Sequence, residues 1–179
     1  MSKGRMFFIT GVSTSGKTTI IPYLKKLLPV NFSVYDFDQR GVPDNVSENW
    51  RKQETRYWLE EGIRDAGQEK TAVVCGISIP SEVEANKDLL ENIEPHYALL
   101  EVSSLKIEER FRQRLSTKEM QNEWARTTGL SLEESVKQNI SFASQLRNIC
   151  QDYNCKIFDT ARFTPEEVAR GIANWIKTC

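Results

Sequence analysis

The stretch best suited to chemistry is Gly11–Thr19, which reads GVSTSGKTT. It satisfies the pattern G-x-x-x-x-G-K-[S/T], and it lies between a short apolar run and an amphipathic stretch, where a strand should pass into a helix. Glycines let the backbone turn its N–H groups onto a phosphate, and the helix N-terminus adds unpaired amides and a favourable dipole. We therefore expect this loop to hold the β- and γ-phosphates of a nucleotide.

Individual residues of the loop have separate expected tasks. Lys17 would bridge the β- and γ-phosphates, and the hydroxyl of Thr18 would bind Mg²⁺. The remaining backbone and hydroxyl groups would surround the phosphates. The loop residues expected to bind the nucleotide are Gly11, Ser13, Thr14, Ser15, Gly16, Lys17, Thr18 and Thr19.

A pair of carboxylates follows the next β-like run. Asp36 and Asp38 are two residues apart, so their side chains share one face if the strand extends through both. Beside a phosphate loop, one carboxylate could hold Mg²⁺ and the other could accept a proton from an attacking hydroxyl. The same spacing also fits two solvated acids at the end of a strand.

Short β-like runs alternate with longer amphipathic stretches along the chain. The expected strands are 5–10, 32–36, 71–76, 97–102 and 156–158. The expected helices are 17–28, 47–66, 81–91, 105–115, 132–150 and 165–178. Continuously apolar strands joined by helices predict an α/β domain of three layers with a parallel sheet, in which ligands bind at the carboxyl ends of the strands.

Length and composition narrow the possible classes of protein. A chain of 179 residues suits one domain, which we expect to span 1–179. The net charge of −1 suggests neither a nucleic acid nor a membrane as a partner, and nothing in the sequence calls for a protein partner. No apolar run is long enough for a secretory signal or a membrane span, so a cytoplasmic location is expected. The spacing of the four cysteines and single histidine does not favour a zinc site.

Two other classes of nucleotide-binding protein fit the sequence poorly. Residues 38–41 match the D-x-x-G of GTPases, but this motif follows the second expected strand rather than the third. Asn86-Lys87-Asp88 begins like the guanine-reading N-K-x-D, but its aspartate comes one position early. An AAA-type ATPase would need an apolar strand ending in Asp-Glu, whereas the run ending at Glu101 offers a lone acid.

The chain resembles the small-molecule P-loop kinases, the group of adenylate, shikimate and gluconate kinases, over nearly its whole length. The motifs that carry the resemblance are GVSTSGKT, the DFD of residues 36–38 and the VVCG of residues 73–76. It implies a P-loop NTPase fold with a five-stranded parallel sheet, helices on both faces and a helical lid at about 115–130. It also implies that Asp36 helps to place Mg²⁺, Asp38 faces the phosphate acceptor and Gly76 lines the acceptor pocket.

An arginine pair extends this resemblance. Arg110 and Arg114 lie four apart on one helical face. In similar kinases the first such arginine stacks on adenine and the second reaches the transferred phosphate. The resemblance further implies that residues 159–162, including Arg162, border the base. A solvated helix face with ion pairs is the competing interpretation of the arginine-rich helix.

The acceptor is less well defined. The segment at about 42–66, which should close over it, carries Trp50 and Tyr57 among arginines but no motif of the three named kinases. Aromatic rings suit a base or sugar, arginines suit an anion, and packing on the sheet is the alternative for the aromatic residues. Arg40 and Arg51 are the arginines expected to contact the acceptor. The lid segment also departs from those kinases, with Arg126 as its only arginine between 116 and 129.

Together these features predict an ATP-dependent phosphotransferase that uses Mg²⁺ and acts on a small-molecule acceptor, most simply a nucleoside or nucleotide. Lys17, Asp38 and Arg114 are the expected catalytic residues. A kinase for a sugar or small hydroxy acid, a nucleotide-dependent switch with slow ATP hydrolysis, and a non-catalytic nucleotide-binding module are the alternatives.

Overall fold

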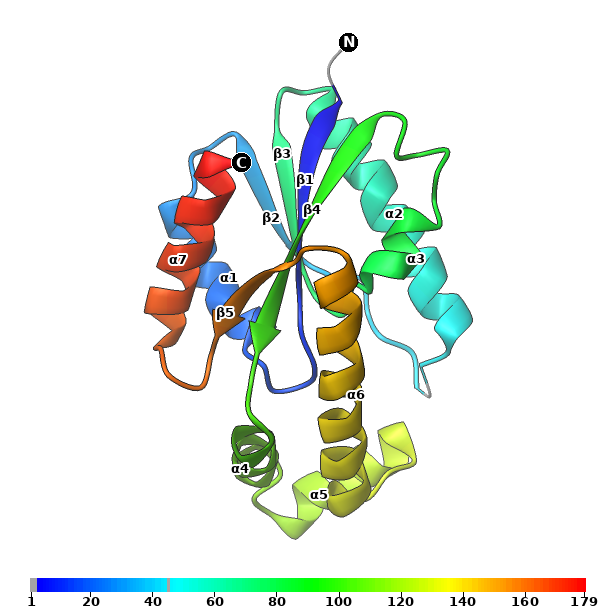
Figure 1. Ribbon diagram of the computed structural model, residues 1–179. Coiled ribbons are helices and arrows are strands. Elements are labelled where there is room, and N and C mark those ends of the chain that lie inside the picture. The colour runs from blue at the N-terminus through cyan, green and yellow to red at the C-terminus, as the bar shows by residue number, and fades with distance from the viewer. Residues whose placement is uncertain (1–2, 45) are drawn as a thin grey trace.

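The centre of the molecule is a five-stranded parallel sheet with the strand order β2-β3-β1-β4-β5 (Figure 1). The computed structural model describes residues 3–44 and 46–179 of the expected domain. Residues 1, 2 and 45 lie outside this description, and residue 45 belongs to the expected acceptor segment. The strands are β1 (Gly4–Thr10), β2 (Phe32–Asp36), β3 (Thr71–Cys75), β4 (Ile93–Glu101) and β5 (Lys156–Asp159). Because β1 is central, the loop that follows it opens at the middle of the edge where the carboxyl ends of the strands lie, here called the carboxyl edge.

Helices cover both faces of the sheet and extend beyond its carboxyl edge. They are α1 (Lys17–Leu27), α2 (Glu48–Ala66), α3 (Pro80–Glu84), α4 (Ser104–Arg114), α5 (Lys118–Thr128), α6 (Leu132–Asp152) and α7 (Pro165–Thr178). Helices α1 and α7 lie on one face, α2, α3 and α6 on the other, and α4 and α5 beyond the carboxyl edge (Figure 1). The three-layer α/β architecture expected from the sequence is confirmed. None of the helices in the described part of the chain is both long and apolar enough to cross a bilayer.

The position of β1 at the centre of the sheet explains why its apolar run is continuous rather than alternating. Phe7 and Ile9 of β1 belong to the core beneath α1 and α7, whereas Met6 and Phe8 belong to the core beneath α2. All four side chains are fully buried. A strand covered on both faces must be apolar at every position, because each side chain enters one of the two cores.

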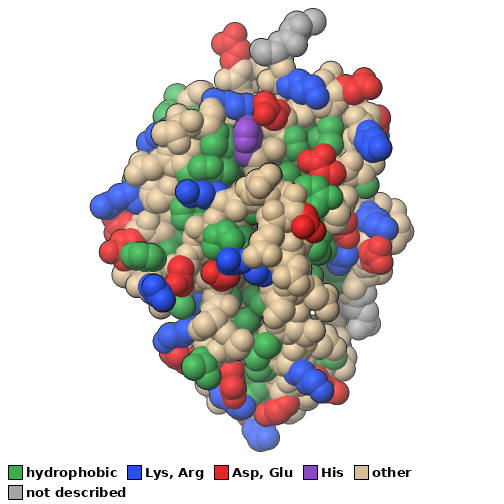
Figure 2. Space-filling view, viewed as in Figure 1, with side chains coloured by type: hydrophobic (Ala, Val, Ile, Leu, Met, Phe, Trp, Pro, Cys, Tyr) green, Lys and Arg blue, Asp and Glu red, His purple; other side chains and the backbone are tan. Residues whose placement is uncertain are grey.

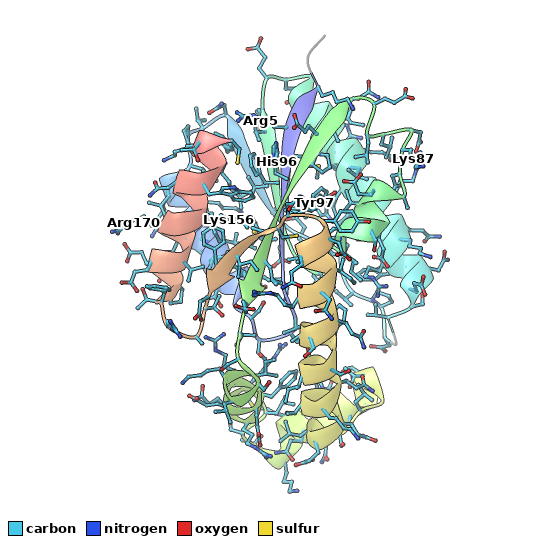
Figure 3. All side chains as sticks on the ribbon, viewed as in Figure 1. Arg5, Lys87, His96, Tyr97, Lys156 and Arg170 are labelled. Carbon is cyan, nitrogen blue, oxygen red and sulfur yellow. The ribbon has the colours of Figure 1, made fainter. Side chains whose placement is uncertain are left out.

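The single histidine takes part in this packing. His96 stacks on Phe7 with ring centroids 4.9 Å apart, and it lies in the amino-terminal half of β4, away from the carboxyl edge (Figure 3). Figure 2 shows positive and negative side chains interspersed over the face that carries this histidine. His96 therefore contributes to the packing around Phe7.

The helix expected at 81–91 is much shorter in the structure, where α3 ends at Glu84. The side-chain amide of Asn86 donates to the carbonyl of Glu82 at 2.9 Å. In a continuing helix that carbonyl would accept from the backbone N–H of Asn86, which instead bonds to Val83. The asparagine side chain therefore replaces the next helical bond and ends the helix.

Two further elements differ from the expected boundaries. Strand β4 begins at Ile93 rather than at residue 97; Pro95 is tolerated because β5 pairs with β4 only from Ala98 onward, which leaves this part of β4 with a neighbour on one side. Helix α5 was not among the helices expected from the amphipathic stretches, but it falls within the helical lid that the resemblance implied at about 115–130. It is capped by Thr117 and stopped by Gly129, which has a φ of 72°, and none of its residues is fully buried.

The turn after β2 closes tightly on the end of β3. The amide of Phe37 donates to the carbonyl of Cys75 at 2.9 Å, and the indole N–H of Trp58 donates to the carbonyl of Phe37 at 3.1 Å. A Cβ atom on Gly76 would lie 1.9 Å from the Cβ of Phe37. Residue 76 must therefore be glycine for Phe37 to be buried here.

This close approach predicts that Gly76→Ala lowers the free energy of unfolding by about 1–3 kcal/mol, because the added methyl group has no space. Urea denaturation measures the change. Gly67→Ala is the matched control: Gly67 has an ordinary helical φ of −64° and the nearest atom to an added Cβ is 3.4 Å away, so this variant should be no less stable than the wild type. Equal stability of the two variants would contradict the packing argument.

Candidate active site

The loop between β1 and α1 is shaped by its two glycines. A Cβ on Gly11 would lie 2.5 Å from the hydroxyl oxygen of Ser15 and 3.0 Å from the carbonyl oxygen of Leu100, so only glycine fits. Gly16 has a φ of 99° and precedes α1 without a side-chain cap. The first amides of α1 are therefore free to bind an anion held in the loop.

Two side chains from distant helices hold this loop from outside. The guanidinium of Arg110 in α4 donates to the carbonyl of Thr14 at 2.9 Å and to the carbonyl of Thr160 at 2.5 Å. The carbonyl oxygen of the Asn139 side chain in α6 accepts from the amide of Ser13 at 3.1 Å. Asn139 was not among the candidate residues, because nothing in its local sequence indicates that α6 passes beside the loop.

Four charged side chains converge at the mouth of the loop. The ammonium of Lys17 donates to the carbonyl of Val12 at 2.7 Å, across the loop. Burial lowers the pKa of Lys17 from 10.5 to about 8, while the nearby charges of Asp38 and Asp36 act in the opposite direction and Arg114 adds to the lowering. The sensitivity of one lysine to all three groups shows that the loop, the turn after β2 and helix α4 meet here.

The two aspartates do not share a strand face as the spacing had suggested. Strand β2 ends at Asp36, and the chain turns so that Phe37 is buried between them. The amide of Asp38 then donates to the Oδ1 of Asp36 at 3.0 Å. Partial burial raises the pKa of Asp38, the charge of Asp36 raises it further and Lys17 lowers it. A tight turn, rather than a pleat, brings these carboxylates together.

A cavity of about 240 Å³ lies beside the loop. One wall is polar, from Arg110 and the start of α1, and the other is apolar, from the segment after β5. Its lining residues are Thr14, Ser15, Gly16, Thr19, Ile20, Arg110, Thr160, Phe163, Pro165 and Val168. An apolar slot next to a phosphate-binding loop suits a flat ring attached to a phosphate chain.

Arg162 lies outside that cavity. Its side chain is 83% exposed and pairs with Asp159 at 3.2 Å. It lines a neighbouring cavity of about 480 Å³ between β4 and α6, together with the ion pair of Glu101 and Arg147. Of the residues expected to border the base, Thr160 lines the cavity beside the loop, and the contact expected of Arg162 stays a prediction.

The two arginines expected to contact an acceptor are both in ion pairs. Arg40 donates to Glu54 at 3.0 Å and lies 3.7 Å above the ring of Tyr57. Arg51 forms three hydrogen bonds with Glu82, the shortest at 2.6 Å. Both arginines hold α2 against its neighbours in this structure, and their contact with an acceptor stays a prediction.

The remaining candidate residues lie around the mouth. Gly76 is buried against Phe37, and its expected place in an acceptor pocket stays a prediction. Arg114 lies 5.2 Å above the ring of Trp124 in α5. Arg126 pairs with Glu123, which raises its pKa, and Asp44 adds to that effect.

The residues available for a metal ion are few. Thr18 lies exposed at the start of α1, and Asp36 lies at the end of β2 with one oxygen fixed by the amide of Asp38. Across residues 3–44 and 46–179, no group of three or more His, Cys, Asp or Glu side chains is arranged to hold a metal ion. A metal here would thus take most of its ligands from water and from a bound phosphate chain.

Solved structures share this fold, although no protein-family model and no curated protein sequence matches the chain. A shikimate kinase from Acinetobacter baumannii, in complex with shikimate, has a TM-score of 0.56 at 13% identity, over 99% of this chain and 94% of that one. A deoxyadenosine kinase from M. mycoides, with bound dCTP, has a TM-score of 0.53 at 12% identity, over 97% and 100%. The fold is that of the P-loop kinases.

The P-loop kinase fold is shared more widely than kinase activity. A tRNA isopentenylpyrophosphate transferase from Staphylococcus epidermidis has a TM-score of 0.59 at 11% identity, over 98% of this chain and 99% of that one. At these identities the likeness concerns the fold. The chemistry of this chain must be argued from its own residues.

The lowered pKa of Lys17 predicts a specific pH dependence of stability. Between about pH 8 and 10.5 the unfolded chain holds a proton on Lys17 that the folded chain has released, so folding becomes more favourable as the pH rises through this window. Lys17→Met removes this contribution. Wild type should therefore gain stability relative to the variant between pH 8 and 10, measured by urea denaturation of both proteins at each pH. Parallel curves would show that Lys17 titrates normally.

Proposed function

We propose that this chain is an ATP-dependent phosphotransferase that moves the γ-phosphate of Mg²⁺-bound ATP to a small-molecule acceptor. The observation that carries the proposal is the convergence of Lys17, Arg114 and the Asp36–Asp38 pair at the mouth of the phosphate loop. A protein that only bound a nucleotide would need the loop and its lysine. Paired carboxylates on the open side are what transfer to a second substrate requires.

The nucleotide would bind along the loop and into the cavity beside it. The amides of the loop and of the start of α1 would hold the β- and γ-phosphates, with Lys17 between them. The base would enter the cavity between Arg110 and Phe163, where a guanidinium on one side and an apolar ring on the other suit a flat heterocycle. The Thr14 and Thr160 carbonyls keep Arg110 in place for this contact.

The donor set fits Mg²⁺, a hard ion that prefers oxygen ligands and takes most of them from water and phosphate. The hydroxyl of Thr18 and the carboxylate of Asp36 would hold it. When bound, the ion would neutralise charge on the β- and γ-phosphates and so assist their separation.

The protein's own groups account for the remaining steps. The acceptor oxygen would bond to the γ-phosphorus as the bond from that phosphorus to the β–γ bridging oxygen breaks, and ADP would leave with the bonding electron pair. Asp38 would take the proton of the acceptor hydroxyl, and its raised pKa makes it a better base than an ordinary aspartate. Lys17 and Arg114 would stabilise the charge on the transferred phosphoryl group.

Helices α4 and α5 would form the lid. They lie beyond the carboxyl edge (Figure 1), and the contact between Arg114 and Trp124 joins them. The pairing of Arg126 with Glu123 keeps the expected lid arginine on the surface of α5. Movement of the two helices toward that segment would exclude water during transfer.

ADP release from Mg²⁺-ATP in the presence of nucleosides, nucleoside monophosphates, sugars and small hydroxy acids tests the proposed function. Stimulation by one class over the baseline without acceptor supports a kinase. Equal release in every sample would favour the nucleotide-dependent switch instead, and tight ATP binding without any release would favour a binding module.

The role of Asp38 makes a sharper prediction. Asp38→Asn should lower turnover of the responsive acceptor by about 10²- to 10⁴-fold, because the amide cannot accept the proton, while the Kd for ATP changes little. Asp152→Asn, which changes an exposed aspartate at the end of α6, is the control. Normal turnover by Asp38→Asn would show that this carboxylate is not the base.

The contact between α6 and the loop makes a second prediction. Asn139→Ala removes the hydrogen bond to the Ser13 amide, so the loop loses a support worth about 0.5–1.5 kcal/mol and the Kd for ATP should rise by several-fold. Isothermal titration calorimetry measures it, with Gln138→Ala on the exposed side of the same helix as control. An unchanged Kd would mean that the loop keeps its shape without Asn139.

A further inference from the structure

The arginines on the acceptor side are all engaged by carboxylates of the protein itself. Four arginines lie between the end of β2 and the end of α2, and each forms an ion pair with an acid of the same connection, of α2 or of the α3 region. The pairs are Arg40 with Glu54, Arg51 with Glu82, Arg56 with Asp88 and Glu60, and Arg64 with Glu61. An anionic acceptor would have to compete with these carboxylates for every guanidinium.

The two pairs nearest the carboxyl edge are the hardest to break. The side chains of Glu54 and Glu82 are only 8% and 10% exposed. The Oε1 of Glu54 is buried and has no hydrogen-bond partner among the described residues, so Arg40 is the group that compensates this buried charge. Withdrawing either arginine toward a ligand would leave a buried carboxylate unpaired, which is strongly unfavourable.

The lysines of this region do not replace the arginines. Lys52 pairs with Glu48 at 2.6 Å, and Lys70 precedes β3 at the opposite edge of the sheet. Lys87 follows α3 and lies on the outer side of the molecule, level with His96 rather than with the carboxyl edge (Figure 3). None of these three ammonium groups is therefore free at the carboxyl edge.

The cations that face the mouth either have a task in the proposed function or, like Arg126 of α5, are paired with a carboxylate. Lys17 and Arg114 would both be taken up by the phosphates of ATP. What then faces the acceptor is the carboxylate pair on the turn after β2, where the amide of Asp38 donates to the Oδ1 of Asp36 at 3.0 Å. With Asp36 taken up by Mg²⁺ in the proposed function, the carboxylate of Asp38 would repel a second anion and accept a hydroxyl proton.

We infer that the acceptor is an uncharged hydroxyl compound, such as a nucleoside or a neutral sugar, and that phosphorylated or carboxylated analogues are rejected. The inference rests on the proposed function and narrows its acceptor class. Arg51 and Arg40 act in it as specificity-determining residues because their ion pairs remove the positive charge that an anionic acceptor would need. Asp38 acts as the base that a hydroxyl acceptor needs and a phosphate acceptor does not.

Matched pairs of acceptors test the inference on the wild-type protein. ADP release from Mg²⁺-ATP is measured with each nucleoside and its 5′-monophosphate, and with each neutral sugar and its phosphate ester. The uncharged member of a responsive pair should have a kcat/KM at least about tenfold above that of its phosphorylated partner. A preference for the phosphorylated member, or a response to a small hydroxy acid alone, overturns this inference and leaves the proposed function standing, whereas no response above the baseline to any of these acceptors overturns both.

The variant Glu82→Gln tests the physical cause. It releases Arg51 from its carboxylate, so the ratio of kcat/KM between the uncharged and the phosphorylated member should fall by about tenfold. Glu61→Gln releases Arg64 at the far end of α2 and should leave the ratio unchanged. A thermal melt checks that both variants fold. If Glu82→Gln does not fold, the comparison of acceptor pairs on the wild-type protein still tests the inference. An unchanged ratio in a folded Glu82→Gln protein overturns the role of Arg51.

Discussion

The structure depends on one constraint: a loop that is to bind phosphate through its backbone amides cannot use those same amides to hold its shape. Most of the contacts that support it therefore come through carbonyls and close packing. Arg110 binds the Thr14 carbonyl, Lys17 binds the Val12 carbonyl, and Gly11 lies against the backbone of Leu100. Two amides are exceptions: that of Ser13 donates to Asn139, and that of Ser15 donates to the carbonyl of Val12. Helices α4 and α6 and strand β4 are thus needed at one place, which the central position of β1 allows.

The distribution of charged side chains around the loop also suits the binding of a phosphate. The proposed phosphate side has a lysine whose pKa is lowered by burial and two arginines, and the proposed acceptor side has two carboxylates on a tight turn. The arginines of α2 and of the turn before it lie close by, yet each is paired with an acid. Arginine thus serves two purposes in this fold: Arg40 and Arg51 join elements of the protein to each other, whereas Arg110 both joins α4 to the loop and lines the cavity beside it, where a ligand can reach it.

The sequence by itself determined the elements whose cause is local. The pattern of Gly11–Lys17 requires a positive φ and a close approach that only glycine allows, and both occur where expected. Apolar runs predicted the strands because burial on both faces leaves no alternative pattern. The start of α7 at Thr164-Pro165, which has a capping box, could also be predicted, because a helix cap depends on residues that are neighbours in the sequence. The α/β class and the loop followed from these local signals.

Only the tertiary structure decided which charged side chains meet. Arg162 and Arg110 are both arginines after apolar strands, yet one is 83% exposed and the other holds the loop through Thr14, which lies 96 residues away along the chain. Asn139 has no local mark of its role, and the pairing of Asp36 with Asp38 depends on the burial of Phe37 against Gly76. The ion pair that engages Arg51 joins α2 to α3 across 31 residues. Such contacts depend on how the helices pack on the sheet, because a side chain pairs with whatever group the fold brings within a few ångströms. The spacing of residues along the sequence does not indicate which group that is.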